Sequence, residues 1–204
     1  PGQLQELLGD IQVALGVVVA RRVDIDLRVD VAVGDEQIQP AVVVGVEKGG
    51  APAEVGPHPG GQAGGGGLIA GIAGCLKSKN PDIEIVGCQP EASAVMYESV
   101  KAGRIVKLDS LPTLSDGTAG GIEEGAITLP ICRDLVDRFV LVSEDEIKAA
   151  IRLVLLRHHT LVEGAAALSV ASFLKTADRY EGKTVVLILS GAKISLETLR
   201  QVLA

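Results

Sequence analysis

The clearest chemical feature of this sequence is a run of four glycines: Gly64, Gly65, Gly66 and Gly67. The run stands directly before Leu68 and the apolar segment 68–73, which we expect to be helical. The first N–H groups of a helix have no partner within it, and the helix dipole favours an anion there. Glycines let a phosphate approach closely because they carry no Cβ. The run therefore predicts a phosphate-binding loop, although a flexible linker has the same composition.

A dinucleotide site is one alternative. Residues 65–70 fit the fingerprint G-x-G-x-x-A. This fingerprint needs an acidic residue at the end of the next strand, to hold the ribose hydroxyls. The strand expected at 83–87 is followed by Cys88 and Gln89, so an amide stands where an acid is required. No strand is expected directly before the loop either. A dinucleotide-binding oxidoreductase is therefore the weakest of the alternatives.

Further motifs follow the glycine run in a fixed order. They are 86–91 (VGCQPE), 115–117 (SDG), 161–166 (LVEGAA) and 189–195 (LSGAKIS). In these motifs, residues 64–204 resemble the C-terminal part of the catalytic domain of serine/threonine dehydratases (threonine ammonia-lyases), which are fold-type II pyridoxal-phosphate enzymes. The resemblance implies a partial α/β domain of the tryptophan-synthase-β-like fold, with a parallel sheet in three layers.

The resemblance also implies roles for individual residues. The backbone amides of 64–67 and of Leu68 would wrap the phosphate of pyridoxal 5'-phosphate. Ser190 would hydrogen-bond the pyridine nitrogen, Glu163 would lie near the cofactor ring, and Gly117 would pass beside it. A hydroxyl leaves that nitrogen largely unprotonated, which suits β-elimination. The implied reaction converts threonine or serine to a 2-oxo acid and ammonia. Each residue also has a plain structural use, in a turn or at a helix start.

The lysine that such an enzyme needs is not found. The family carries it in the motif Ser-Phe-Lys-x-Arg-Gly-Ala, which is absent from this chain. Lys48 is the only lysine upstream, too near the glycine run to leave room for the intervening domain, and Lys193 lies in the loop after Ser190. We therefore assign no catalytic residue and expect an incomplete, inactive form of the enzyme. The alternative is a non-catalytic fragment that binds phosphate or the cofactor, or that interacts with a partner subunit.

A metal site is not expected. Some members of the family hold a divalent cation just after the strand at 83–87. The matching positions carry Gln89, Ser93 and Val95. Hard cations prefer several carboxylate oxygens, which these side chains lack.

The composition and net charge of the chain limit the classes of binding partner that we expect. The chain has 204 residues, a net charge of −7 and a pI near 5.0, which argues against nucleic acid and anionic membranes as partners. No apolar run is long enough to span a membrane. The expected partner is a small amino-acid substrate, and the resemblance leaves room for a homo-oligomer. Three scattered cysteines indicate reduced, buried thiols in a cytoplasmic protein: Cys75, Cys88 and Cys132.

The chain divides near residue 63. In 64–204 the predicted strands 83–87, 139–142 and 184–189 alternate with helices, which indicates a largely parallel sheet. Ser143 and Glu146 form a capping box at one helix start. Residues 1–63 are Val/Gly/Pro-rich and contain no aromatic residue. Strand patterns there, at 23–31 and 41–46, allow a small antiparallel sheet or a poorly ordered arm. The composition of 1–63 suggests, as a hypothesis, an unintended reading frame joined near residue 62.

Overall fold

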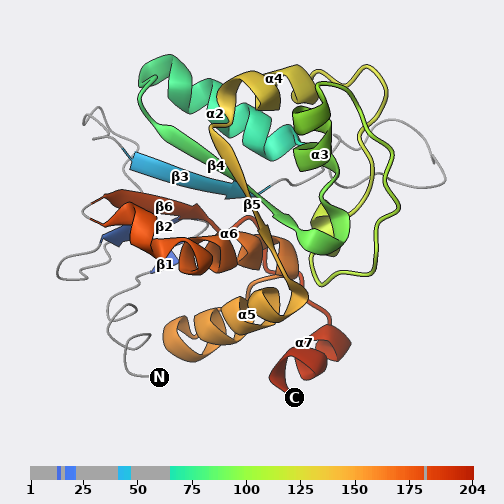
Figure 1. Ribbon diagram of the computed structural model, residues 1–204. Coiled ribbons are helices and arrows are strands. Elements are labelled where there is room, and N and C mark those ends of the chain that lie inside the picture. Colours follow the sequence, from blue (N-terminus) through green and yellow to red (C-terminus); the bar gives the residue numbers. More distant parts are fainter. Residues whose placement is uncertain (1–12, 15–16, 22–40, 47–64, 182) are drawn as a thin grey trace.

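A sheet of six strands lies between two groups of helices (Figure 1). The computed structural model describes residues 13–14, 17–21, 41–46, 65–181 and 183–204. The strand order is β1-β2-β6-β3-β4-β5. The strands are β1 (Val13–Ala14), β2 (Val17–Arg21), β3 (Ala41–Val46), β4 (Glu84–Pro90), β5 (Arg138–Val142) and β6 (Thr184–Ile188). Four of them, β6, β3, β4 and β5, are mutually parallel, so the predicted α/β fold with a largely parallel sheet is confirmed.

The strand β3 lies in the middle of this sheet. It pairs in parallel with β6 on one side and with β4 on the other. The segment 41–46 is thus a strand, as predicted, but it is not part of a separate antiparallel sheet. Its continuous apolar run is typical of parallel strands, which are covered on both faces. The strands β1 and β2 do pair antiparallel, and β2 extends the sheet beyond β6. The strand predicted at 23–31 lies outside the described residues.

One face of the sheet is covered by α2 (Gly67–Lys79), α3 (Val95–Ala102) and α4 (Thr128–Leu135). Ile69, Ile85 and Met96 are fully buried in the core between these helices and the sheet. Gly87 on β4 is needed for this packing, because a Cβ there would lie 2.5 Å from the Phe139 ring.

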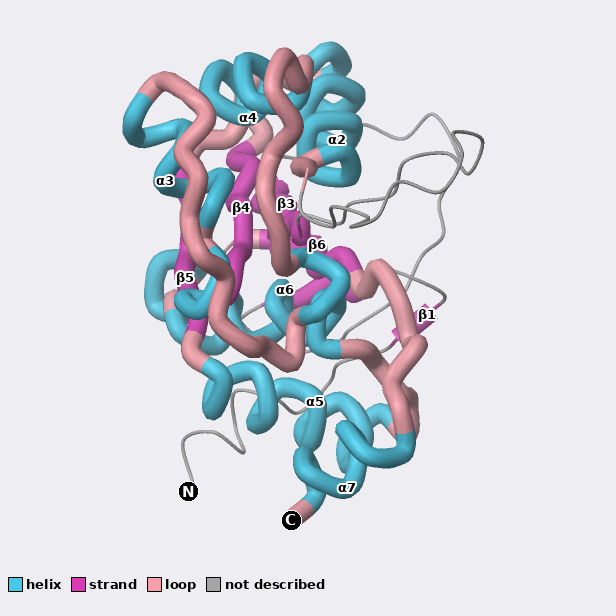
Figure 2. Tube along the Cα trace, turned by 90° about the vertical axis from the view of Figure 1, so that its right-hand side faces the viewer, coloured by secondary structure: helices cyan, strands magenta, loops and turns pink. Residues whose placement is uncertain are grey.

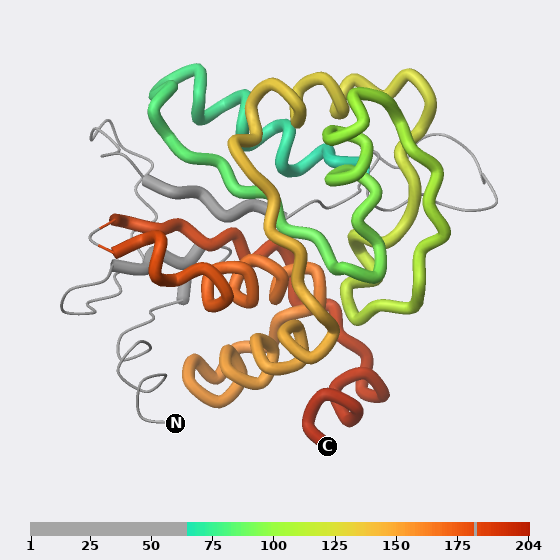
Figure 3. The backbone as a smooth tube through the Cα atoms, in the orientation of Figure 1, coloured from blue at the N-terminus to red at the C-terminus, as the bar shows by residue number. Residues whose placement is uncertain are grey.

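The other face is covered by α5 (Glu144–His158), α6 (Gly164–Lys175) and α7 (Leu196–Leu203). The helix α6 is central: every residue from 164 to 173 is buried. Its many alanines allow close packing against the strands and α5. The C-terminal helix α7 packs beside α5 (Figure 3).

The starts of α5 and α3 show how nearby side chains set where a helix begins. The capping box at α5 is confirmed: the Ser143 hydroxyl accepts a hydrogen bond from the Glu146 N–H, and the Glu146 carboxylate accepts one from the Ser143 N–H. Between β4 and Gly103 the chain breaks into a 3₁₀ turn, Glu91–Ser93, and α3. The Gln89 side chain explains the break, because its Oε1 accepts the Tyr97 N–H at 2.7 Å and caps α3 from the strand.

The carboxyl ends of the parallel strands meet at one edge of the sheet, onto which Figure 2 looks. The strand β3 precedes α2 in the chain, and Ser190 follows β6. Because β3 and β6 are neighbours, the segments leading to the glycine run and to Ser190 start from adjacent strand ends. In open α/β sheets this edge is where ligands bind.

Candidate functional site

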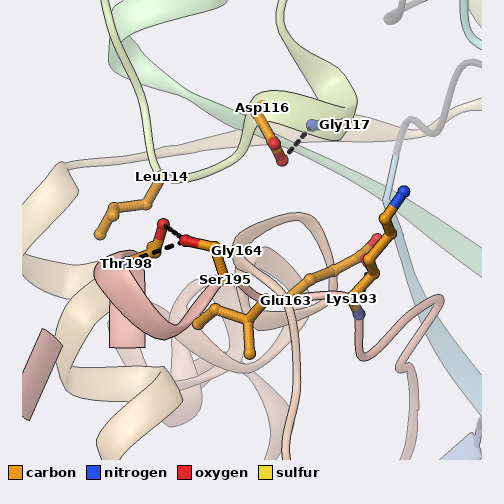
Figure 4. A pocket seen from close by; sticks show the side chains of 9 residues that line it. Leu114, Asp116, Gly117, Glu163, Gly164, Lys193, Ser195 and Thr198 are labelled. Carbon is orange, nitrogen blue, oxygen red and sulfur yellow. Dashed lines mark hydrogen bonds between the residues drawn. The ribbon is translucent and has the colours of Figure 1, made fainter. Parts of the chain in front are cut away.

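Three segments far apart in the sequence meet in one pocket at this edge (Figure 4). They are the loop 114–117, the start of α6 and the segment 193–198 after β6. The pocket has a volume of about 590 Å³. Its lining residues are Leu114, Asp116, Gly117, Glu163, Gly164, Lys193, Ile194, Ser195 and Thr198.

Glu163 joins α6 to the loop after β6. It is the N-cap residue of α6 and is 7% exposed. Its backbone N–H donates to the Gly191 carbonyl at 3.1 Å, and its Oε2 accepts the Lys193 N–H at 3.1 Å. A Cβ on Gly191 would overlap the Glu163 carboxylate. The carboxylate is therefore seated directly against the backbone of 191–193.

Gly164 and Gly117 bring the loop 114–117 against α6. A Cβ on Gly164 would collide with the Leu114 carbonyl, so only glycine allows this approach. A Cβ on Gly117 would lie 3.4 Å from the Ala165 Cβ and 3.9 Å from Glu163 Oε1. The structure thus brings together two residues singled out in the sequence, Gly117 and Glu163. Gly164 was missed, although a glycine at the first position of a helix is a signal that could have indicated it.

The same contacts fix Ser190, because it stands directly before Gly191. Ser190 is half-buried and lies two residues beyond the end of β6. Its chain neighbours on the C-terminal side, Gly191 and Lys193, are the two that bond Glu163. Ser190 and Glu163 are therefore held near each other by one backbone hydrogen bond and one to the Glu163 carboxylate.

The glycine run provides a second set of candidate ligand-binding groups, which lies at the start of α2 and is separate from the residues around Glu163. Gly66 is the N-cap residue and is left-handed, with φ 75°. The first helical hydrogen bond runs from the Ala70 N–H to the Gly66 carbonyl at 3.0 Å, so the N–H groups of Gly67, Leu68 and residue 69 precede it. The first turn of α2 contains no acidic residue. These donors suit an anion. Gly65 has open space where a Cβ would stand, and Gly64 lies outside the described residues.

The two sets do not line the same pocket: none of residues 65–68 is among the lining residues around Glu163. They share the carboxyl edge through the adjacent strands β3 and β6. Their donors also fit different parts of one ligand. Backbone amides at α2 suit a phosphate, and the hydroxyl of Ser190 suits a ring nitrogen.

The remaining sequence predictions concern lysines and metals. Lys48 lies outside the described residues, and Lys193 is exposed at the pocket. At the positions matching a cation site, both polar atoms of the Gln89 side chain are hydrogen-bonded, to the Tyr97 N–H and the Ser93 carbonyl. Within the described ranges there is no group of three His, Cys, Asp or Glu residues placed to hold a metal ion. The absence of a metal in the working protein stays a prediction.

The cysteines differ from the expectation at one position. Cys88 and Cys132 are buried, whereas Cys75 is exposed, because it lies on the outward side of α2. Burial raises the pKa of the Cys88 thiol to about 12, against the opposing effects of Ser172 and Arg138. A thiol with so high a pKa stays protonated at neutral pH and is a poor nucleophile. In the part of the chain that is described, no helix is long and apolar enough to cross a membrane.

Comparison with known proteins supports the resemblance. The family described as pyridoxal-phosphate dependent enzyme matches residues 36–191, which is more than half of the chain and includes β3. The chain is 43% identical over 137 residues to an L-threonine ammonia-lyase of Geobacter sulfurreducens, covering 67% of this chain and 34% of that protein. It is 41% identical over 141 residues to the catabolic L-threonine dehydratase of Escherichia coli K12, covering 68% and 43%.

A solved structure agrees with these relatives. The processed form of threonine deaminase isoform 2 from Solanum lycopersicum superimposes with a TM-score of 0.66 and 30% identity, over 80% of this chain and 41% of that one. The chain therefore spans less than half the length of the relatives it matches. The domain boundary predicted at residue 63 stays a prediction. The match over 36–191 and the shared fold together identify the chain as a member of the pyridoxal-phosphate-dependent enzyme family.

Proposed function

We propose that this chain forms the cofactor-binding part of a threonine or serine dehydratase, an enzyme that eliminates water and ammonia from a hydroxy amino acid. The observation that carries the proposal is the meeting of Gly117, Glu163 and the loop after Ser190 at the carboxyl edge of the sheet. The neighbouring N-terminus of α2 adds donors for a phosphate. Two of its relatives, an L-threonine ammonia-lyase and an L-threonine dehydratase, agree with this reaction class.

The residues take separate parts in holding the cofactor. The N–H groups at Gly66, Gly67 and Leu68, and those of residues 64 and 65, bind the phosphate. The Ser190 hydroxyl would donate to the pyridine nitrogen, and Gly117 would pass beside the ring. Bound pyridoxal phosphate would supply the electron sink for β-elimination. The substrate class is a small hydroxy amino acid, with the cytoplasm as location and a homo-oligomer as assembly.

The chain alone is proposed not to turn over substrate. The lysine motif of the family is absent from its sequence, and the chain spans 34–43% of the two relatives compared above. This observation favours a second candidate function, a non-catalytic part that binds phosphate or pyridoxal phosphate and works with a partner subunit. Both candidates share the same binding site, so binding and turnover must be measured separately.

The test is a titration of the full chain with pyridoxal phosphate, with and without inorganic phosphate as competitor. We expect saturable binding that phosphate competes, and no turnover of threonine or serine. Ser190→Ala should weaken binding about tenfold, as expected for a lost hydrogen bond, whereas the exposed Glu124→Ala should bind like wild type.

Two results would contradict these proposals in different ways. If the chain shows no pyridoxal-phosphate binding that inorganic phosphate can compete, the proposed cofactor site is refuted. Borohydride reduction of the bound chain, followed by mass spectrometry, reports whether a lysine has reacted with the cofactor. A single labelled lysine together with threonine turnover would overturn the proposal that this chain is inactive.

A further inference from the structure

Glu163 makes a contact that the sequence did not indicate, because its carboxylate bonds the protein's own backbone. It is 7% exposed, and its Oε2 accepts the Lys193 N–H. Burying a carboxylate is unfavourable unless hydrogen bonds replace its water. At a helix N-cap the usual replacement is an N–H of the same helix, yet Glu163 makes no such capping bond with its side chain. The carboxylate is directed instead to a different segment of the chain.

The contacts between Glu163 and that segment are reciprocal. The Glu163 N–H donates to the Gly191 carbonyl, and the Lys193 N–H donates to the Glu163 carboxylate. Both bonds are 3.1 Å long. We call these two bonds the Glu163 latch. The loop residues that they bond, Gly191 and Lys193, lie on either side of residue 192. Ser190 directly precedes Gly191 in the chain. Closing the latch therefore fixes where the chain leaves β6 and where Ser190 stands.

The shape of Gly191 belongs to the same arrangement. A Cβ at this position would overlap the carboxylate of Glu163. The glycine thus lets the carboxylate approach the backbone closely enough to accept the Lys193 N–H. Gly191 is not among the described glycines that have a left-handed backbone. The need for glycine at this position is therefore steric, and it comes from the contact with Glu163.

We propose that Glu163 is a positioning residue, which acts on the bound cofactor through the loop 191–193 and Ser190. This inference rests on the proposed function, because it assigns the means by which Ser190 is aimed at the pyridine nitrogen. A hydrogen bond from a hydroxyl depends steeply on distance and angle, so a loosened loop weakens it. The latch needs an acceptor oxygen at residue 163, and it does not need a negative charge.

The first test is hydrogen exchange in the full chain without cofactor, read on a peptide covering 190–195. Glu163→Ala removes the acceptor and should speed exchange of the Lys193 amide about tenfold or more. Glu163→Gln keeps an acceptor and should exchange like wild type. Gly191→Ala should loosen the loop as well, because its methyl group displaces the carboxylate. Unchanged exchange in both Glu163→Ala and Gly191→Ala would overturn the latch.

Matched controls separate the latch from general damage. Gly71→Ala adds the same methyl group on α2, where no atom lies within 4 Å. Glu124→Ala removes an exposed carboxylate from a loop. Neither should alter exchange at 190–195. Glu163→Gln also serves as the folded rescue variant if the alanine variant is poorly folded.

The second test asks whether Glu163 works through Ser190. Glu163→Ala should weaken pyridoxal-phosphate binding about tenfold, and so should Ser190→Ala. The double variant should bind no more weakly than Ser190→Ala alone, since coupled residues are not additive. Independent losses that multiply would overturn the proposal, and so would a Glu163→Gln variant as weak as Glu163→Ala. A wild-type chain that binds no cofactor would refute the proposed function, while the exchange test still decides the latch.

Discussion

The two sides of the candidate cofactor site both use glycine, but for different reasons. On the α6 side, both glycines meet the protein itself: a Cβ on Gly164 would collide with the Leu114 backbone, and one on Gly191 would displace the end of the Glu163 side chain. On the α2 side, Gly65 has open space around it. The fold therefore requires glycine at position 164, and the Glu163 contact requires it at position 191. At Gly65 a small residue is needed only if something outside the protein approaches. Substitution by alanine can thus separate folding from binding.

The largest effect is expected on the packed side. Gly164→Ala places a methyl group on the Leu114 carbonyl, and neither backbone can move without disturbing α6. We expect a loss of about 3 kcal/mol in the free energy of unfolding, measured by urea denaturation. Gly71→Ala is the matched control, and it should stabilise slightly because it replaces a helical glycine in open space. A Gly164→Ala protein as stable as wild type would remove the contrast between the two sides.

An intermediate effect is expected at Gly66, where the backbone itself needs glycine. Its φ of 75° is left-handed, and this conformation costs other residues roughly 1–2 kcal/mol. Gly66→Ala should therefore lose about 1 kcal/mol of stability, measured by the same denaturation. It should also weaken phosphate-competable binding, because the cap that precedes the free N–H groups shifts. Unimpaired binding by a destabilised Gly66→Ala chain would place the phosphate elsewhere.

A smaller effect is expected at the far end of α6, where Lys175 joins Glu146 at 3.0 Å and Glu91 at 3.5 Å. Burial alone would raise the pKa of the Glu146 carboxyl, but the Ser143 N–H and the Lys175 ammonium outweigh it, so this pKa lies below its usual value. Burial alone would lower the pKa of the Lys175 ammonium, but the Glu146 and Glu91 carboxylates outweigh it, so this pKa lies above its usual value. Both ions are partly solvent-exposed, so Lys175→Gln should lose only roughly 0.2–1 kcal/mol at neutral pH.

The pH dependence of that loss follows from the two pKa directions. A lowered folded pKa gives stability above the unfolded pKa, here near 4.5, and this stability disappears as the pH falls through the folded pKa. A raised folded pKa gives stability below 10.5 that disappears as the pH rises through it. The stability difference between wild type and Lys175→Gln should therefore be full between these limits and shrink in acid. A constant difference down to strongly acidic pH would contradict the ion pair.

The smallest effect on stability is expected at Gly65. Gly65→Ala should change the free energy of unfolding by no more than about 0.5 kcal/mol, because its Cβ meets nothing. Binding of pyridoxal phosphate should nevertheless fall several-fold, because the methyl group stands where a phosphate would approach. Full binding by Gly65→Ala would show that the glycine run is a linker at this position.

The local sequence predicted where helices and strands occur better than it predicted which distant residues they contact. The capping box of Ser143 and Glu146 uses residues three positions apart, and the structure has it as predicted. The helix α6 begins at Gly164, with Glu163 as its cap residue. The carboxylate of Glu163 bonds a loop that follows in the chain only after α6 and β6, and no local pattern reports such a partner.

The strand β3 shows the same limit more strongly. Its apolar run predicted a strand, but its place depends on two neighbours from distant parts of the sequence. The strand pattern at 41–46 allowed a small antiparallel sheet or a poorly ordered arm, whereas β3 pairs in parallel with β4 and β6 in the main sheet. The family match, which begins at residue 36, includes this strand. Long-range strand pairing is decided by the assembled core, so composition alone could not place it.

The central place of β3 has a consequence for biosynthesis. Ala41 pairs with Thr184, so this strand is made early and receives its second neighbour late. Until β6 leaves the ribosome, one edge of β3 has no strand to pair with, and open edges recruit strands from other chains. Pairing over such a separation is also slow. Nascent chains arrested before β6 should therefore aggregate or bind chaperones, and release from that state should coincide with the synthesis of one short strand.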